Sequence, residues 1–242
     1  DFSLSRGLGD VYKRQMQTVV DLPGLVSGQV TSMVANATHL WATTGSSGQG
    51  ASGTGLLQGT FMADGTVEWE FGWTLPGNTV AGDLHLHGTD LFIASTPGGM
   101  LKLDTQTRTI SQVGGSLHGK LDTMHVYNSQ LVVGLAGDGG SPPGVQMFNP
   151  LTSQFGNGRL ISGLPSNIVN GFTETSDVLY IATDGGIGRW NYTTDDWMDS
   201  ITMSNGLPND IVEDVRAVGN SVYMATPTGV FIWDPATQTG ST

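Results

Sequence analysis

The sequence contains no cysteine among its 242 residues, so disulfide bonds and thiolate metal sites are excluded. Basic residues are also scarce, because nine Lys and Arg stand against 21 Asp and Glu and leave a formal net charge of −12. A surface this acidic repels phosphate backbones, and we therefore expect no nucleic acid partner. Cations, neutral sugars and basic proteins remain compatible with such a charge.

Long apolar runs and helical periodicity are absent as well. No apolar stretch approaches the roughly 20 residues that a membrane-spanning helix needs, so we expect no membrane insertion of this chain. Charged residues make up only 12% of the sequence, whereas glycines number 36. This composition is typical of many short strands joined by tight turns, in sheets whose faces are mostly buried.

What the sequence does contain is a pair of strands repeated five times. A short apolar strand ends in a small residue, and a second strand that begins with glycine follows it. The small residues at the aligned position are 52, 40, 48 and 43 positions apart: Ala42, Ala94, Gly134, Ala182 and Ala225. A period of about 40–50 residues built from short strands is typical of a β-propeller. The predicted fold class is therefore all-β: a β-propeller with five four-stranded blade repeats in this chain.

The repeats open at turns that carry Leu-Pro or a related pair, and they lie near 22–74, 75–116, 117–163, 164–206 and 207–242. Residues 16–20 resemble the outermost strand of the fourth repeat. Two arrangements stay open: this segment closes a five-bladed ring, or the chain is a fragment of a roughly seven-bladed ring, which is the arrangement we favour. Only eight residues follow Asp234, so we expect no good fourth strand in the last repeat.

The first fifteen residues have no counterpart in any repeat. Their end, ValTyrLysArgGln at 11–15, resembles the translated remnant of a sequencing adapter found in metagenomic gene predictions. We interpret residues 1–15 as a non-native leader, with a disordered native leader as the alternative. Residues 16–242 are assigned to the propeller.

Chain order predicts that the Leu-Pro turns share one rim with the loops that follow each second strand. Two of these loops, 44–55 and 135–144, are long. Insertions on one face of a repeat protein often mark its binding face, although long Gly/Ser loops are also simply tolerated there. The candidate ligand-binding residues are polar positions on this rim: Asn78, Asp138, Asn167, Asp184 and Asp210.

A catalytic or metal site is harder to nominate. His85 and His87 share one face of a strand, and His125 takes the position of His85 in the next repeat. The other repeats hold different side chains at that position: Met33, Thr173 and Arg216. We therefore interpret these histidines as packing residues and expect no metal and no cofactor. The enzyme alternative is a lyase or hydrolase with an axial site: His85, His125 and Glu213.

One repeat carries a family resemblance. Residues 163–170, followed by 179–191, resemble the two-component regulator propeller repeat, and 205–212 with 222–234 match it nearly as well. The shared Gly, Pro and aromatic positions form turns and packing. The resemblance implies a non-catalytic module for ligand sensing or for protein or polysaccharide binding, outside the cytoplasm (extracellular or periplasmic). It also implies further blades or signalling domains in a longer parent protein; a passive repeat of a surface protein is the other alternative.

Overall fold

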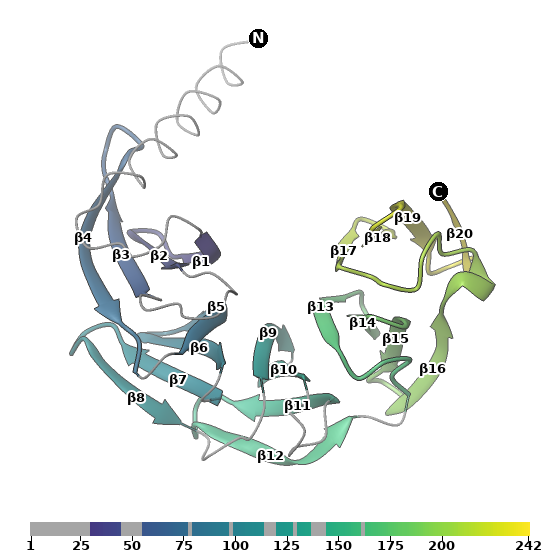
Figure 1. The fold of residues 1–242 in the computed structure, drawn as a ribbon, viewed down its shortest axis with the longest axis horizontal. Helices are drawn as coiled ribbons and strands as arrows, with labels where there is room; N and C mark the ends of the chain where they lie inside the picture. The colour runs from purple at the N-terminus through teal and green to yellow at the C-terminus, as the bar shows by residue number, and fades with distance from the viewer. Residues whose placement is uncertain are drawn as a thin grey trace. The chain divides into compact units, whose positions relative to one another are not determined.

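The computed structural model describes residues 30–44, 55–76, 79–96, 99–113, 120–127, 130–136, 144–160 and 163–242. In them the chain forms five four-stranded antiparallel sheets, each made of four consecutive strands (Figure 1). The predicted five repeats of four strands are therefore confirmed, and we term the sheets blades 1 to 5. The segments 1–15 and 16–20, on which the leader and ring-closure predictions rest, lie outside the described residues.

The strands follow one another along the chain, blade by blade. Blade 1 consists of β1 (Val30–Ala35), β2 (His39–Thr44), β3 (Gly55–Phe61) and β4 (Val67–Thr74). Blade 2 consists of β5 (Val80–His87), β6 (Asp90–Thr96), β7 (Gly99–Asp104) and β8 (Thr109–Val113). Blade 3 consists of β9 (Lys120–Tyr127), β10 (Gln130–Ala136), β11 (Gly144–Asn149) and β12 (Gln154–Leu160). Blade 4 consists of β13 (Val169–Glu174), β14 (Val178–Thr183), β15 (Gly186–Asn191) and β16 (Asp196–Ile201). After a 3-10 turn, η1 (Met203–Asn205), blade 5 consists of β17 (Asp214–Val218), β18 (Ser221–Thr226), β19 (Gly229–Asp234) and β20 (Thr239–Ser241).

The blades group into two compact units. Unit 1 is built on blades 1 and 2, and unit 2 is built on blades 3, 4 and 5. In unit 1 the first strands β1 and β5 pack against each other; in unit 2 the first strand β13 packs against both β9 and β17. Neighbouring blades of a unit thus meet along their first strands. Nothing in the described part of the chain is a helix long and apolar enough to cross a bilayer.

Each third strand begins with glycine. In blades 4 and 5 the backbone conformation at this position explains why glycine is required. Gly186 and Gly229 have φ angles of 119° and 147°, which side chains with a Cβ rarely adopt. A threonine at the end of the second strand closes the same turn. Thr183 Oγ1 donates to the Gly186 carbonyl at 2.7 Å, and Thr226 Oγ1 donates to the Gly229 carbonyl at 2.8 Å. The Thr-x-x-Gly spacing therefore forms the hairpin between the second and third strands.

The hairpin between the third and fourth strands has the same design in blades 2 to 5. The last residue of the third strand accepts hydrogen bonds through its side-chain oxygen from two backbone N–H groups of the turn, which is an Asx turn. The accepting residues are Asp104, Asn149, Asn191 and Asp234. Four positions later stands a residue with a left-handed φ between 54° and 60°: Arg108, Ser153, Asp195 and Gln238.

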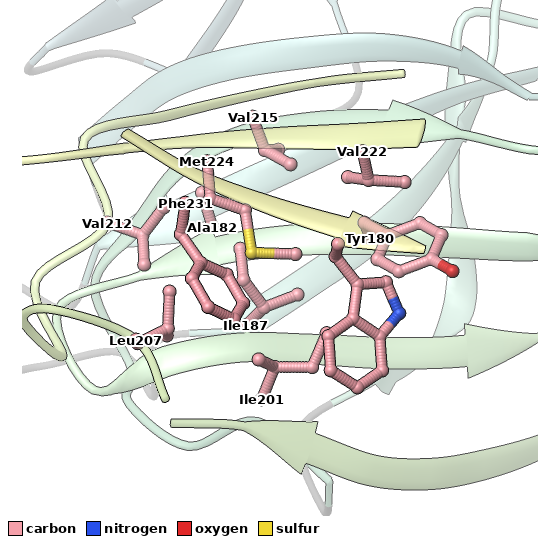
Figure 2. Packing of buried hydrophobic residues seen from close by; sticks show 11 residues of the cluster. Tyr180, Ala182, Ile187, Ile201, Leu207, Val212, Val215, Val222, Met224 and Phe231 are labelled. Carbon is pink, nitrogen blue, oxygen red and sulfur yellow. The ribbon is translucent and has the colours of Figure 1, made fainter. Parts of the chain in front are cut away.

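The core of unit 2 lies between the sheets. Figure 2 shows the cluster that joins blades 4 and 5, in which side chains from both sheets point toward one another. Every member is at most 3% exposed: Tyr180, Ala182, Ile187, Ile201, Leu207, Val212, Val215, Val222, Met224, Phe231 and Trp233. Stacked sheets that bury such residues gain roughly 1.5–3 kcal/mol for each large side chain. Inter-blade packing is therefore what holds unit 2 together.

Two sequence-based expectations are wrong. A fourth strand does form in the last repeat, because the compact Asx turn leaves enough chain for β20, and Asp234 pairs with Thr239. The second concerns the position of His85. Ser32 pairs with Thr43 directly after the bulge of blade 1, as Asp83 pairs with Ala94 directly after the bulge of blade 2. The residue that corresponds to His85 in blade 1 is therefore Val34 and not Met33, and Val34 pairs with Trp41 as His85 pairs with Phe92.

Candidate functional site

The Leu-Pro turns and the loop after the second strand of blade 4 meet on one edge of unit 2. The Asp184 N–H donates to the Ile168 carbonyl at 3.3 Å, which joins the Asp-Gly-Gly loop to the turn that precedes β13. The Val212 N–H donates to the Thr183 carbonyl at 3.0 Å, which brings the turn before β17 to the same edge. The predicted common rim is therefore confirmed for these three segments.

The contact between the loop and the turn is close enough to exclude a side chain. A Cβ at Gly185 would lie 2.6 Å from the carbonyl oxygen of Pro165. Real Cβ atoms do not approach a backbone oxygen so closely, so the second position of the Asp-Gly-Gly loop must be glycine. The loop that carries Asp184 is thus held directly against the Leu-Pro turn.

One side chain that the sequence analysis did not single out connects this edge. Asn170 Nδ2 donates to Asp184 Oδ1 at 2.9 Å and to the Val212 carbonyl at 2.9 Å. The register between β13 and β14 shifts between Val169 and Gly171, so Asn170 is the extra residue of a β-bulge. Bulges re-aim a side chain out of the regular ladder. Here the bulge lets Asn170 bridge blade 4 and the segment leading into blade 5.

The three candidate ligand residues that the structure describes all lie on this edge. Asn167 is exposed, Asp184 is half-buried, and Asp210 is half-buried. The Asp210 carboxylate already accepts a hydrogen bond from the Met203 N–H through Oδ1, at 2.7 Å. It therefore steadies η1. The remaining two candidates, Asn78 and Asp138, lie outside the described residues.

Exposed isoleucines accompany the polar candidates. Ile168 follows Asn167 in one turn, and Ile211 follows Asp210 in the next. The two isoleucines are 46% and 42% exposed. We use the term rim surface for five residues: Asn167, Ile168, Asp184, Asp210 and Ile211. It combines two apolar side chains with an amide and two carboxylates, so it can contact an apolar face and hydrogen-bond donors of one ligand.

The residues of the enzyme alternative have other surroundings. The His125 ring stacks on Phe172 with centroids 6.5 Å apart, and its Nε2 lies 3.9 Å from Oε2 of Glu174. These contacts give His125 a packing role between blades 3 and 4. His85 lies on β5 of unit 1, and Glu213 is exposed at the start of blade 5. Within the described ranges, no group of three or more His, Cys, Asp or Glu could hold a metal ion.

Sequence comparisons identify no relative. No protein-family model matches this sequence, and no curated protein is significantly similar to it. The fold, however, occurs in solved structures at low sequence identity.

Two of these structures are extracellular domains from B. thetaiotaomicron. One is assigned to the hybrid two component system BT3049 and has 16% identity and a TM-score of 0.63, with 89% of this chain and 30% of that chain covered. The other is assigned to the hybrid two component system BT4673 and has 18% identity and a TM-score of 0.65, with 88% of this chain and 27% of that chain covered. This chain therefore spans less than a third of their length.

A designed protein is similar as well. The computationally designed Ika8 protein has 13% identity and a TM-score of 0.57, with 85% of this chain and 70% of that chain covered. At such identities a structural match shows the fold alone. Together with the five four-stranded sheets, these matches confirm the predicted β-propeller.

Proposed function

We propose that this chain is a non-catalytic propeller module of an extracellular or periplasmic sensor region, and that it binds a polysaccharide or a protein on its rim surface. The observation that carries the proposal is the composition of that surface. Two successive turns each present a polar side chain followed by an exposed isoleucine, and Asp184 stands on the loop that contacts the first turn. The same repeat position thus offers matched contacts from two neighbouring blades.

The hydrogen-bonding capacity of the rim surface supports this role. Asp184 and Asp210 each use Oδ1 for a bond within the protein. An ionised carboxylate has about four acceptor sites, so each of them keeps acceptors for an outside donor. Sugar hydroxyls and basic side chains are such donors, and the net charge of −12 favours neutral or basic ligands over acidic ones.

The similar structures support the sensor setting. Two of them are extracellular domains assigned to two component systems, and the sequence resembles the propeller repeat of that family. Under this proposal the module belongs to a longer protein that contains further blades or signalling domains. The enzyme alternative receives no comparable support from these structures, and the His125 ring packs on Phe172 and lies near Glu174 of the neighbouring blade.

The test is a binding screen with rim variants. The full chain is applied to an array of neutral and acidic oligosaccharides and to a panel of immobilised basic and acidic peptides, and hits are titrated by calorimetry. We expect a neutral sugar or basic peptide to bind, and Asn167→Ala or Asp184→Asn to weaken that binding about tenfold, a loss of roughly 1.4 kcal/mol. Asp184→Asn keeps the oxygen that accepts from Asn170 and so separates binding from folding.

The matched control is Asp177→Asn. Asp177 is an exposed carboxylate of the same blade, in the hairpin between β13 and β14 rather than in the rim segments, and its removal changes the net charge equally. Equal effects of the Asp177 and Asp184 variants would place binding elsewhere. The absence of any ligand from both panels would favour the passive surface repeat.

A further inference from the structure

The blades of each unit pack through the same positions of their sheets. In blade 4 the face turned to blade 5 carries Tyr180, Ala182 and Ile187, which are 1%, 0% and 0% exposed. They pack against Val222 and Met224, which are fully buried on the opposing face of blade 5 (Figure 2). We use the term trailing face for the face of a blade that covers the next blade in the chain, and leading face for the opposite one.

The other contacts within the units repeat this arrangement. In blade 3 the trailing-face residues Val132 and Val145 are both 0% exposed and pack against Phe172 of blade 4. In blade 1 the trailing-face residue Leu56 is 0% exposed and packs against Leu84 of blade 2. Three separate interfaces therefore bury equivalent positions. One is the residue directly after the glycine that begins the third strand, and the others lie beside it on the second strand.

Blade 5 presents the same positions uncovered. Its register places Val230 opposite Ala225, as Ile187 stands opposite Ala182, so the residues that correspond to Tyr180 and Ile187 are Tyr223 and Val230. Tyr223 is 38% exposed and Val230 is 52% exposed. Next to them on β19, Ile232 is 37% exposed. The trailing face of blade 5 thus holds an aromatic and two β-branched side chains in contact with solvent.

We propose that the trailing face of blade 5 is a docking surface for a further four-stranded blade of the same repeat. The choice of occupant rests on continuity with the three interfaces already described, because each one joins a trailing face to the apolar leading face of a propeller blade. The incoming blade would present apolar residues where blade 5 presents Val215, Val222 and Met224.

The polar contacts at this face differ from those of blade 4. In blade 4, Thr173 Oγ1 accepts from the Ala217 N–H of blade 5 at 2.9 Å. Blade 5 has Arg216 at the corresponding position, 71% exposed at its side chain and 3.6 Å from Asp214. Arg216 is a donor, so it would take a carbonyl or carboxylate acceptor where an incoming blade offers one, and otherwise its exposed side chain stays in solvent beside Asp214.

A second copy of this chain fits less well. It would bring Arg216 against Arg216 in a symmetric contact of two trailing faces, and both copies carry a net charge of −12. The trailing face would then meet another trailing face, a pairing that none of the three described interfaces uses.

The experiment extends the full chain by one blade. Asp234–Thr239 and Asn191–Asp196 are equivalent strand pairs, so Thr242 corresponds to Asp199 and a second copy of residues 200–242 can follow Thr242 in register. Tyrosine nitration with tetranitromethane, read by peptide mass spectrometry, reports whether Tyr223 is covered. In the extended chain we expect nitration of the original Tyr223 to fall to the level of the buried Tyr180, with hydrogen exchange of β19 slowed.

The matched control is the same extension with Val215→Asp and Met224→Asp in the added copy only. These substitutions place two carboxylates on the apolar leading face of the added copy. We expect the original Tyr223 to be nitrated in this control as in the unextended chain. Equal nitration of the two extended chains would overturn the proposal, because a blade with an intact leading face would then fail to dock. Light scattering of the unextended chain gives a separate check, and a dimer lost on Val230→Asp would identify a second copy as the occupant and also overturn it. Because neither readout involves a rim ligand, their outcome is independent of the proposed sensor function.

Discussion

Single polar side chains hold the rim of unit 2 together. The Asn170 amide donates one hydrogen bond to Asp184 and one to the Val212 carbonyl. The Asp210 carboxylate accepts a hydrogen bond from the Met203 N–H. The rim surface is therefore preorganised by bonds within the protein. A ligand that binds there meets turns that are already fixed, which limits the ordering cost of association.

Replacing Asn170 tests this arrangement at the scale of one residue. Asn170→Ala leaves the Val212 carbonyl and one Asp184 oxygen without their donor, so we expect the free energy of unfolding to fall by about 1–2 kcal/mol. Asn170→Asp is expected to cost more at neutral pH, because a carboxylate then faces Asp184 and a carbonyl oxygen, and to recover in part on acidification. Urea unfolding at several pH values measures both. Wild-type stability of Asn170→Ala would show that the bridge contributes nothing.

The repeated Asx hairpin is the clearest device at the scale of an element. The same turn is built with aspartate in blades 2 and 5 and with asparagine in blades 3 and 4. The backbone N–H groups of Ala236 and Thr237 hold the pKa of Asp234 below its ordinary value, and the N–H of Thr107 is the main cause of the same shift at Asp104. Asparagine makes the same bonds without a charge, so two blades titrate at this turn and two do not.

The sign of the pH effect follows from the lowered pKa. Between the lowered pKa and the ordinary one the unfolded chain binds more protons than the folded chain, so stability falls as the pH falls. The contribution of Asp234 is fully present above the ordinary value and is lost on acidification through the lowered one. We expect Asp234→Asn, which lacks the charge, to be slightly less stable than wild type at neutral pH and to lose less stability between about pH 5 and pH 3, so that the two proteins converge in acid. The reverse variant, Asn191→Asp, should gain acid sensitivity. Parallel acid curves for wild type and Asp234→Asn would contradict this account.

At the scale of the whole molecule, the faces of neighbouring blades supply the core. The side chains that join blades 4 and 5 come from two sheets and from the segment between them, and neither sheet could bury them alone. Stability should therefore depend on which face of a strand a residue occupies more than on the residue type.

Two valines of blade 5 provide a matched comparison. Val222 lies on the leading face and is 0% exposed, whereas Val230 lies on the trailing face and is 52% exposed. We expect Val222→Ala to lower the free energy of unfolding by about 2 kcal/mol, from two lost buried carbon groups and a residual cavity. Val230→Ala should cost less than about 1 kcal/mol. Thermal and urea unfolding of both variants measure the difference, and equal losses would mean that the trailing face is already covered.

Much of the fold could be predicted because its signals are local and repeated. The small residue of the second strand, the glycine that starts the third strand and the Asx residue that ends it recur at a regular spacing, and each reports the backbone geometry of its own hairpin. Local sequence signals did not predict the short strand β20 or the residue equivalences that depend on a β-bulge. The expectation for β20 was wrong because three residues can pair. The equivalence of Met33 with His85 was wrong by one residue, because the residue of blade 1 that matches Ala94 in register is Thr43 and not Ala42.

The candidate site was predictable only in part. Chain order placed Asn167, Asp184 and Asp210 on a common rim, since strands that alternate in direction return their turns to the same edge. The bridge made by Asn170 was not predictable, because an asparagine at the start of a strand reads as one more turn residue. Its role depends on a bulge and on a carbonyl 42 positions away in the sequence.

The sequence by itself determined the five strand repeats, the turn that closes each hairpin and the acidic character of the surface, because each depends on neighbouring residues or on composition. Only the tertiary structure decided which face of each blade is buried, since alternating apolar residues occur on both faces of these strands. It alone distinguishes Val222 from Val230, two valines of one sheet, because burial is a property of the neighbouring blade and not of the strand that carries the residue.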